Sequence, residues 1–188
     1  MDASTAFAGA AALLIGLLLG GAVSFNRFVR ERNHVRESWS NVDTELRRRH
    51  DLIPNLVEAV KGYAAHERST LEAVIRARAA ASERHGTPGD QAEAERGVAR
   101  SLRDLLALAE QYPNLKANEQ FIALQDQLVE TEDRIQLARR IYNANVRDLN
   151  RRVQSVPSNV VAAALGIKEA EYFEVDGVVR GAPSVRVA

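Results

Sequence analysis

The stretch ASTAFAGAAALLIGLLLGGAVSF, residues Ala3 to Phe25, decides how the chain is organised. No charged residue lies between Asp2 and Arg27. At about 1.5 Å per residue, a helix of this length spans the roughly 30 Å hydrocarbon core of a bilayer. A soluble core helix has no need of so long an uncharged run. The sequence therefore predicts a membrane helix that contacts the lipid bilayer through residues 3–25.

The flanks of this run predict an uncleaved, oriented anchor. A secretory signal needs a basic segment before its apolar run, and only Met1 and Asp2 precede this one. Ala22-Val23-Ser24 resembles a cleavage site, so a removed signal is the alternative. The basic residues follow the run, at Arg27, Arg30, Arg32 and Arg36. The positive-inside rule then predicts a single-pass protein of the cytoplasmic (inner) membrane, with its N-terminus outside and its large domain in the cytoplasm.

Small residues recur every four positions within the run, at Ala8, Ala12, Gly16 and Gly20. Such stripes let membrane helices approach one another closely. Ala12, Gly16 and Gly20 are therefore candidates for packing against a second membrane helix. The alternative is the ordinary enrichment of glycine and alanine in membrane helices.

The composition excludes several classes of function. The chain has no cysteine, which excludes disulfides, thiolate catalysis and cysteine-ligated metals. Lys+Arg and Asp+Glu are equal at 25 each, so the broad positive field of a nucleic-acid-binding protein is missing. We therefore expect no nucleic-acid partner.

The sequence after Asn26 has a helical pattern without an obvious stop until about Arg84. Two apolar rows with a spacing of seven predict packed, coiled-coil-like helices. One row contains Val35, Val42, Leu56 and Tyr63, and the other contains Trp39, Leu46, Ile53, Val60 and Val74. Pro54 lies inside this pattern and lacks the N–H of a helical residue, so a kink or break is expected between Asp51 and Pro54.

The second half predicts further helices. The segment His85–Asp90, with its Gly and Pro-Gly, is expected to be a loop before a helix over residues 91–111. A third helix is expected over residues 117–154, with a regular row of Phe121, Leu128, Ile135, Tyr142, Leu149 and Val156. Pro157 should end it, and Ser158 should cap a short helix over residues 159–165 that Gly166 closes. Asp176-Gly177, between two β-prone segments, predicts a hairpin.

These elements predict an all-α fold. It consists of a transmembrane anchor over residues 1–26 and an elongated, antiparallel up-and-down bundle of three to four helices over residues 27–166. A short hairpin or tail over residues 167–188 follows.

Polar residues beside the apolar rows are the candidate site. Arg49 interrupts one row, which predicts an ion pair inside the bundle with Glu67 or Glu132. With Tyr142, these residues form a predicted structural polar network. The polar strip near Glu132 also includes Thr131, Arg134, Arg139 and Asn143. It offers no nucleophile and no phosphate loop, so we expect no catalytic residue and no cofactor. The four histidines lack the spacing of a helical metal pair, so no metal site is expected either.

Several blocks of sequence resemble the LemA family. They are Phe25-Asn26-Arg27 through Asn33, Ser38-Trp39-Ser40, Val42-Asp43, Arg48–Glu58, Val60–Ala64, His66-Glu67, Leu115–Phe121, Leu124-Gln125, Thr131-Glu132, Ile135, Ala138-Arg139, Tyr142-Asn143, Pro157-Ser158-Asn159, Gly166 and Tyr172-Phe173-Glu174. Ser38 stands where the family usually has Ala, and Phe25 where it often has Tyr. The resemblance implies a single-span membrane protein with a helical bundle, and it brings no enzymatic activity or catalytic residue. Some relatives are linked to magnetosomes, which implies work in organising membrane compartments.

The sequence therefore predicts a membrane-anchored, non-enzymatic scaffold that assembles with itself as a homo-oligomer or with another membrane protein. The alternative is a membrane-tethered enzyme or ligand sensor that uses the polar strip around Glu132 and Tyr142.

Overall fold

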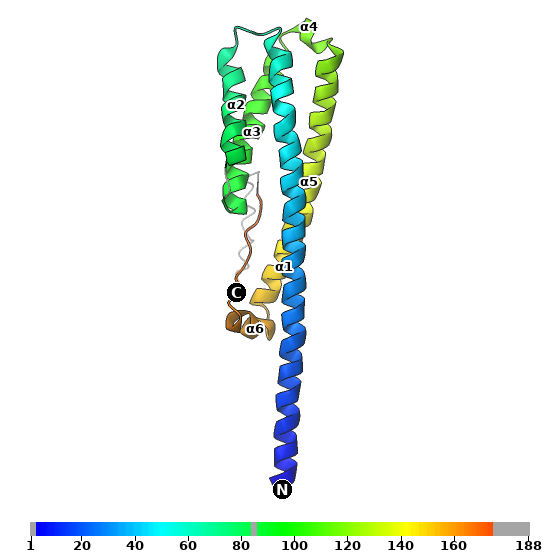
Figure 1. Cartoon of the computed structure of the whole chain (residues 1–188), viewed down its shortest axis with the longest axis vertical. Coiled ribbons are helices and arrows are strands. Elements are labelled where there is room, and N and C mark those ends of the chain that lie inside the picture. Colours follow the sequence, from blue (N-terminus) through cyan, green and yellow to red (C-terminus); the bar gives the residue numbers. More distant parts are fainter. Residues whose placement is uncertain (1–2, 84–85, 175–188) are drawn as a thin grey trace, which may run out of the picture. The chain divides into compact units, whose positions relative to one another are not determined.

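The computed structural model describes residues 3–83 and 86–174, which contain six helices and no strand (Figure 1). The helices are α1 (Ala3–Lys61), α2 (Arg68–Glu83), α3 (Pro88–Ala109), α4 (Pro113–Lys116), α5 (Glu119–Gln154) and α6 (Ser158–Ala164). The predicted all-α fold class is confirmed. Most of the predicted C-terminal hairpin, from Val175 onward, lies outside the described residues. The division into anchor, bundle and tail stays a prediction.

Contacts between residues divide the chain into two compact units. Unit 1 contains the described parts of residues 1–49 and 129–172, and unit 2 contains those of residues 50–128 and 173–188. Helices α1 and α5 each contribute to both units.

In unit 1, α1 and α5 run antiparallel. Glu31, Trp39 and Arg49 of α1 contact Arg152, Tyr142 and Glu132 of α5, respectively, so rising numbers on one helix meet falling numbers on the other. The buried apolar residues between them include Val42, Leu46, Ile135, Val146 and Leu149.

Helix α6 closes unit 1. Its Ala162 is buried against Phe28 of α1 and Leu149 of α5. Gly166 ends α6 at a φ of 65°, a left-handed conformation that favours glycine. The Gly166 N–H donates to the carbonyl of Ala163, and the Ile167 N–H donates to that of Ala162. This pair of bonds is a Schellman motif, which confirms Gly166 as the end of the short helix.

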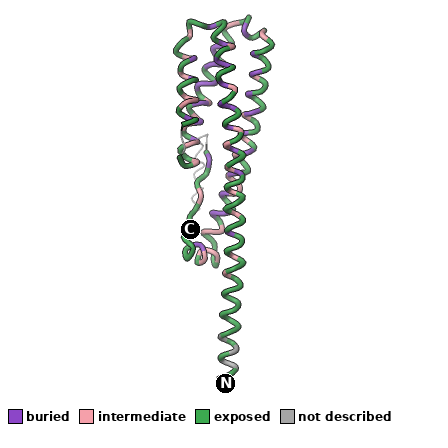
Figure 2. The backbone as a smooth tube through the Cα atoms, in the orientation of Figure 1, coloured by how far each residue is buried: buried purple, intermediate pink, exposed green. Residues whose placement is uncertain are grey.

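Unit 2 has a separate apolar core. Helices α2 and α3 pack against each other, and the core also draws on the last part of α1 and the first part of α5. Ile53, Leu56, Val98, Leu105 and Phe121 are all fully buried. Figure 2 shows buried residues recurring among exposed ones along these helices.

Of the kink or break predicted at Pro54, the break is wrong, because α1 continues through Pro54 to Lys61. A proline in a helix leaves the carbonyl four residues earlier without its N–H donor. That carbonyl belongs to His50, and the Arg78 Nε of α2 donates to it at 2.8 Å. A side chain from another helix thus replaces the missing backbone bond.

The first helical region divides at a different place, between Lys61 and Arg68. The N–H groups of Tyr63 and Ala64 both donate to the carbonyl of Val60, which closes the last turn of α1. Lys61 followed by Gly62 is a sequence signal for a helix end, although the apolar rows continue past it.

Other helix boundaries also differ from the prediction. Helix α3 begins at Pro88 rather than Gln91, because Thr87 and Asp90 form a capping box. Helix α5 begins at Glu119, where the Asn118 Oδ1 accepts a bond from the Phe121 N–H. Ser158 does not cap α6. Its hydroxyl donates instead to the carbonyls of Arg152 and Ser155, and α6 begins without a side-chain cap.

Candidate functional site

The first part of α1 has an exposed apolar surface. Within residues 3–83 and 86–174, it is the one helix that is long and apolar enough to cross a membrane, judged by length and composition. Its large side chains are exposed, with Leu13 at 72% and Leu17 at 76%. Figure 2 shows the described part of this segment mainly as exposed. The rest of unit 1 therefore leaves this segment uncovered.

The small residues of this segment lie on an open face. A Cβ added at Gly16 or Gly20 would meet no atom within 4 Å. Ala12, Gly16 and Gly20 line one wall of a groove whose other wall includes Val160 of α6. A role of these residues in packing against a second membrane helix stays a prediction.

Arg49 forms an ion pair with Glu132, one of its two predicted partners. The Arg49 Nη1 lies 2.9 Å from the Glu132 Oε2, and the two side chains are 2% and 42% exposed. The Gln136 Nε2 donates to the other carboxylate oxygen at 3.3 Å. The guanidinium is therefore buried, while its partner keeps contact with solvent. Glu67 lies in the turn after α1, within unit 2.

Tyr142 holds the chain that follows α6. Its hydroxyl donates to the carbonyl of Glu171 at 2.8 Å, and its ring lies 5.2 Å from that of Trp39. Burial, and secondly the charge of Glu171, raises the pKa of Tyr142 to about 12. Asn150 supports the same segment with two bonds to Ala170, one donated by its amide and one accepted by its oxygen. No sequence pattern marks Asn150, because its partner, the backbone of Ala170, comes close to it only in the folded chain.

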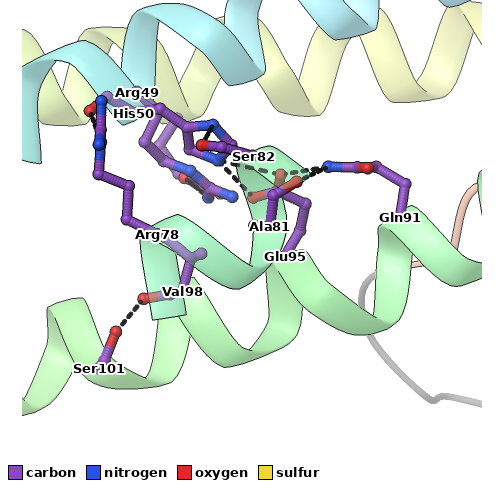
Figure 3. Close-up of polar contacts among 10 residues, drawn as sticks. Arg49, His50, Arg78, Ala81, Ser82, Gln91, Glu95, Val98 and Ser101 are labelled. Atoms are coloured by element: carbon purple, nitrogen blue, oxygen red, sulfur yellow. Dashed lines mark hydrogen bonds and ion pairs between the residues drawn. The ribbon is translucent and has the colours of Figure 1, made fainter. Parts of the chain in front are cut away.

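A second buried polar cluster lies in unit 2 and joins α1, α2 and α3 (Figure 3). The Glu95 side chain is fully buried, and its carboxylate oxygens lie 3.1 and 3.4 Å from the His50 Nε2. The other ring nitrogen of His50 lies 3.1 Å from the Ser82 hydroxyl. The Gln91 amide bridges the Glu95 carboxylate and the Ala81 carbonyl. His50 and Glu95 are buried, Gln91 is half-buried and Ser82 is exposed, and these side chains bond to one another across three helices, so the cluster has a structural role.

No pattern in the sequence marks this cluster. His50 has no second histidine four residues away, and Glu95 follows the apolar spacing of α3 without a motif around it. Among the described residues, no group of three or more histidine and acidic side chains could hold a metal ion. His34 is exposed and lies 3.6 Å from Glu37 on the same helix.

The polar strip of α5 meets a small pocket. The pocket has a volume of about 290 Å³, and its lining includes Ser38, Glu45, Arg134 and Leu137. Arg134 also binds the exposed Glu130, first by hydrogen bonding and then by charge, which lowers the pKa of Glu130. This is an ordinary helix-surface pair between residues four apart. The alternative ligand-sensor hypothesis would have to use this pocket, since Glu132 and Tyr142 make the structural contacts described above.

The sequence matches the LemA family over residues 38–187. The chain belongs to the LemA family. This LemA-family chain is 29% identical over 175 residues to magnetosome protein MamQ 2 of Paramagnetospirillum magneticum, covering 80% of the chain and 64% of that protein. It is 25% identical over 185 residues to magnetosome protein MamQ of Magnetospirillum gryphiswaldense, covering 85% and 68%. It is also 24% identical over 156 residues to protein LemA of Metamycoplasma hominis, covering 82% and 71%.

The chain thus spans somewhat less than two thirds of the length of the Paramagnetospirillum relative. The family match includes most of both helical units and begins after the apolar segment of α1. Family membership therefore agrees with the helical fold, and the apolar segment is supported by its own composition.

Proposed function

We propose that this LemA-family protein is a single-span membrane protein whose helical units serve as a scaffold for protein partners, without catalysing a reaction. The observation that carries the proposal is the uncovered apolar surface of α1. Leu14, Leu18 and Leu19 are each more than half exposed, as are Leu13 and Leu17. A contiguous apolar surface of this kind is unstable in water and stable in a bilayer.

The basic residues after the apolar segment support an orientation. Arg27, Arg30 and Arg32 are exposed, and all follow the uncharged run. The positive-inside rule then favours the inner membrane, with the N-terminus outside and the helical units in the cytoplasm.

Three observations support a scaffold. Buried polar side chains make structural contacts: Arg49 and Glu95 each join two helices, and Asn150 binds the segment after α6. On α5, Val129, Leu137 and Ile141 are exposed, at 63%, 52% and 48%. Their surface offers apolar contact to a second copy of the chain or to another membrane protein. The relation to proteins named for magnetosomes supports a part in organising a membrane compartment.

Alkaline extraction of membranes that contain the full chain tests the anchor. The parent should stay with the lipid. The double variant Leu14→Arg, Leu18→Arg should be released, because each arginine at the centre of a span costs about 2.5–3.5 kcal/mol. The matched control Asn33→Arg, Glu37→Arg has the same spacing on α1 beyond the span and should behave as the parent. Release of the parent itself would contradict the anchor.

Crosslinking in native membranes followed by mass spectrometry tests the scaffold. We expect crosslinks from α5 to a second copy or to another membrane protein. Leu137→Lys together with Ile141→Lys should reduce them, while Arg140→Lys on the same helix should not. A chain without protein neighbours in intact membranes would contradict a scaffold.

A further inference from the structure

An apolar groove runs between α1 and α6 within unit 1. Its volume is about 960 Å³. One wall comes from the apolar segment of α1, including Gly16, Gly20 and Val23, and the other comes from Val156 and Val160. The groove therefore joins the segment expected in the bilayer to a part of the chain more than a hundred residues later.

The two faces of α6 differ sharply. Ala162 is 1% exposed and fixes α6 against Phe28 and Leu149. Val156 and Val160, which face the groove, are 80% and 68% exposed. Val156 lies just before α6 and Val160 lies within it, so two β-branched apolar residues this exposed stand close to the buried Ala162 and indicate a surface that is covered by something outside the chain.

The position of α6 along α1 identifies what covers it. Phe28, the residue on which α6 packs, follows Val23 by five positions, or about 7.5 Å along the helix axis. The headgroup layer on each side of a bilayer is roughly 5–8 Å thick. If the apolar segment spans the bilayer, as the proposed function requires, α6 therefore lies at the level of the headgroups.

The charges at the groove fit a phospholipid. Arg27 and Arg152 are both part of its lining. The Arg152 Nε is paired with Glu31 at 2.7 Å. Arg27 is exposed and forms no ion pair with any residue in 3–83 or 86–174. A free guanidinium at the mouth of an apolar groove matches a phosphate joined to an acyl chain.

We propose that this groove binds an anionic phospholipid, with an acyl chain against Val156 and Val160 and the phosphate at Arg27. Helix α6 is thus a second membrane contact, which lies in the interfacial layer beside the spanning helix. Short elements with an exposed apolar face and basic neighbours bind bilayers in this way. Two contacts would fix how unit 1 is rotated about the axis of α1 at the membrane, which the spanning helix alone would not do.

The absence of cysteine allows a direct test with single labels. Val156→Cys and Val160→Cys, in the full chain reconstituted into nanodiscs, are each labelled with an environment-sensitive fluorophore. Lipids that carry a nitroxide on the acyl chain then report contact by quenching. Leu17→Cys is the control for the bilayer interior, and Ser40→Cys, exposed on α1 beyond the bilayer, is the control for water.

We expect the labels at Val156 and Val160 to be blue-shifted and quenched, the label at Leu17 to be quenched, and the label at Ser40 to be neither. Quenching at Leu17 alone would overturn the lipid groove while leaving the anchor intact. Absence of quenching at Leu17 would overturn the proposed anchor and the groove with it. A blue shift at Val160 without quenching would identify a protein on this surface and would also overturn the inference.

A second arm tests the phosphate. Quenching at Val160 should be stronger in nanodiscs with phosphatidylglycerol than in those with phosphatidylcholine alone, and raised salt should reduce the difference. Arg27→Gln should abolish this difference, whereas the control Arg36→Gln, more than two turns farther along α1, should keep it. An unchanged lipid preference in Arg27→Gln would overturn the assignment of the phosphate to Arg27.

Discussion

A single hydrogen bond lets α1 pass through Pro54. If the Arg78 Nε replaces the backbone donor that Pro54 lacks, Arg78→Met should leave the His50 carbonyl without its donor and lower the free energy of unfolding by about 1–3 kcal/mol. The same change should cost clearly less in a Pro54→Ala background, because the alanine supplies a backbone N–H that can bond to the carbonyl of His50. Chemical unfolding in detergent, followed by circular dichroism, compares the parent, Arg78→Met, Pro54→Ala and the double variant. The difference between the two costs of Arg78→Met is the coupling energy between the two positions. Equal costs in both backgrounds would contradict the replacement.

The Arg49–Glu132 pair makes an asymmetric prediction. Glu132→Gln removes the negative charge that lies 2.9 Å from the buried guanidinium, and should cost about 1–3 kcal/mol. Arg49→Met removes the buried charge and leaves Glu132 with access to water, so it should destabilise less. Thermal unfolding of both variants compares them, with Glu130→Gln on the exposed surface as a control. A larger loss for Arg49→Met would mean that the ion pair is not the main contribution of Arg49.

Tyr142 predicts a loss of stability at high pH. Its pKa is raised from 10.0 to about 12 by burial and by Glu171, so the unfolded chain gives up this proton before the folded chain does. The neutral phenol therefore contributes its full stability below pH 10, and the contribution should decline as the pH rises from 10 to 12. Tyr142→Phe should flatten this part of the profile, whereas Tyr172→Phe, at an exposed tyrosine, should not. An identical decline in Tyr142→Phe would assign it to other groups.

At the scale of single residues, the sequence predicts only those side chains that interrupt or complete a recognisable pattern. Arg49 could be recognised because a charge interrupts an apolar row, yet its partner could not be chosen, since Glu67 and Glu132 fit equally well. Glu95 was missed, because a buried glutamate looks like a surface glutamate until His50 and Gln91 are seen around it. The burial and pairing of such a side chain depend on residues far away in the sequence. The sequence does not show which of these residues lie close in space.

The apolar row of α5, with its spacing of seven, predicts which substitutions in this helix lower the free energy of unfolding. Leu128 is 7% exposed in the core of unit 2. Val156 was predicted to end the same packed row, which is wrong, because it lies after the end of α5 and is 80% exposed. Leu128→Ala should therefore cost about 2–5 kcal/mol of unfolding free energy. Val156→Ala should change it by less than about 0.5 kcal/mol in detergent. An unchanged melting midpoint for Leu128→Ala would refute the packed row.

The existence of the long helices could be predicted, whereas several of their ends could not. Periodicity identifies a helix because every turn repeats the signal, but a boundary depends on one or two local bonds. Gly166 was predicted correctly since only glycine readily adopts its left-handed φ. Ser158 was not, because its hydroxyl had carbonyl acceptors in the preceding turn that compete with the role of a cap.

At the scale of the whole molecule, the fold class followed from two strong signals, one uncharged run and several rows with a spacing of seven. The groove between α1 and α6 did not follow from either. Its walls are far apart in the sequence, and each looks ordinary alone: a stripe of small residues in a membrane helix, and a short helix rich in valine and alanine. Only the packing of Ala162 on Phe28 brings them together.

The stripe of Ala12, Gly16 and Gly20 has two possible neighbours in a bilayer, a second helix or the lipid in this groove. We expect lipid, because the stripe forms the wall opposite Val160. The double variant Gly16→Ile, Gly20→Ile adds bulk where a Cβ meets no atom, so it should leave the fold intact and fill the groove. It should reduce lipid quenching of a label at Val160 while sedimenting in detergent as the parent does, and Leu14→Ile, Leu18→Ile should change neither readout. Loss of self-association in the glycine variant alone, with quenching unchanged, would assign the stripe to a second helix instead.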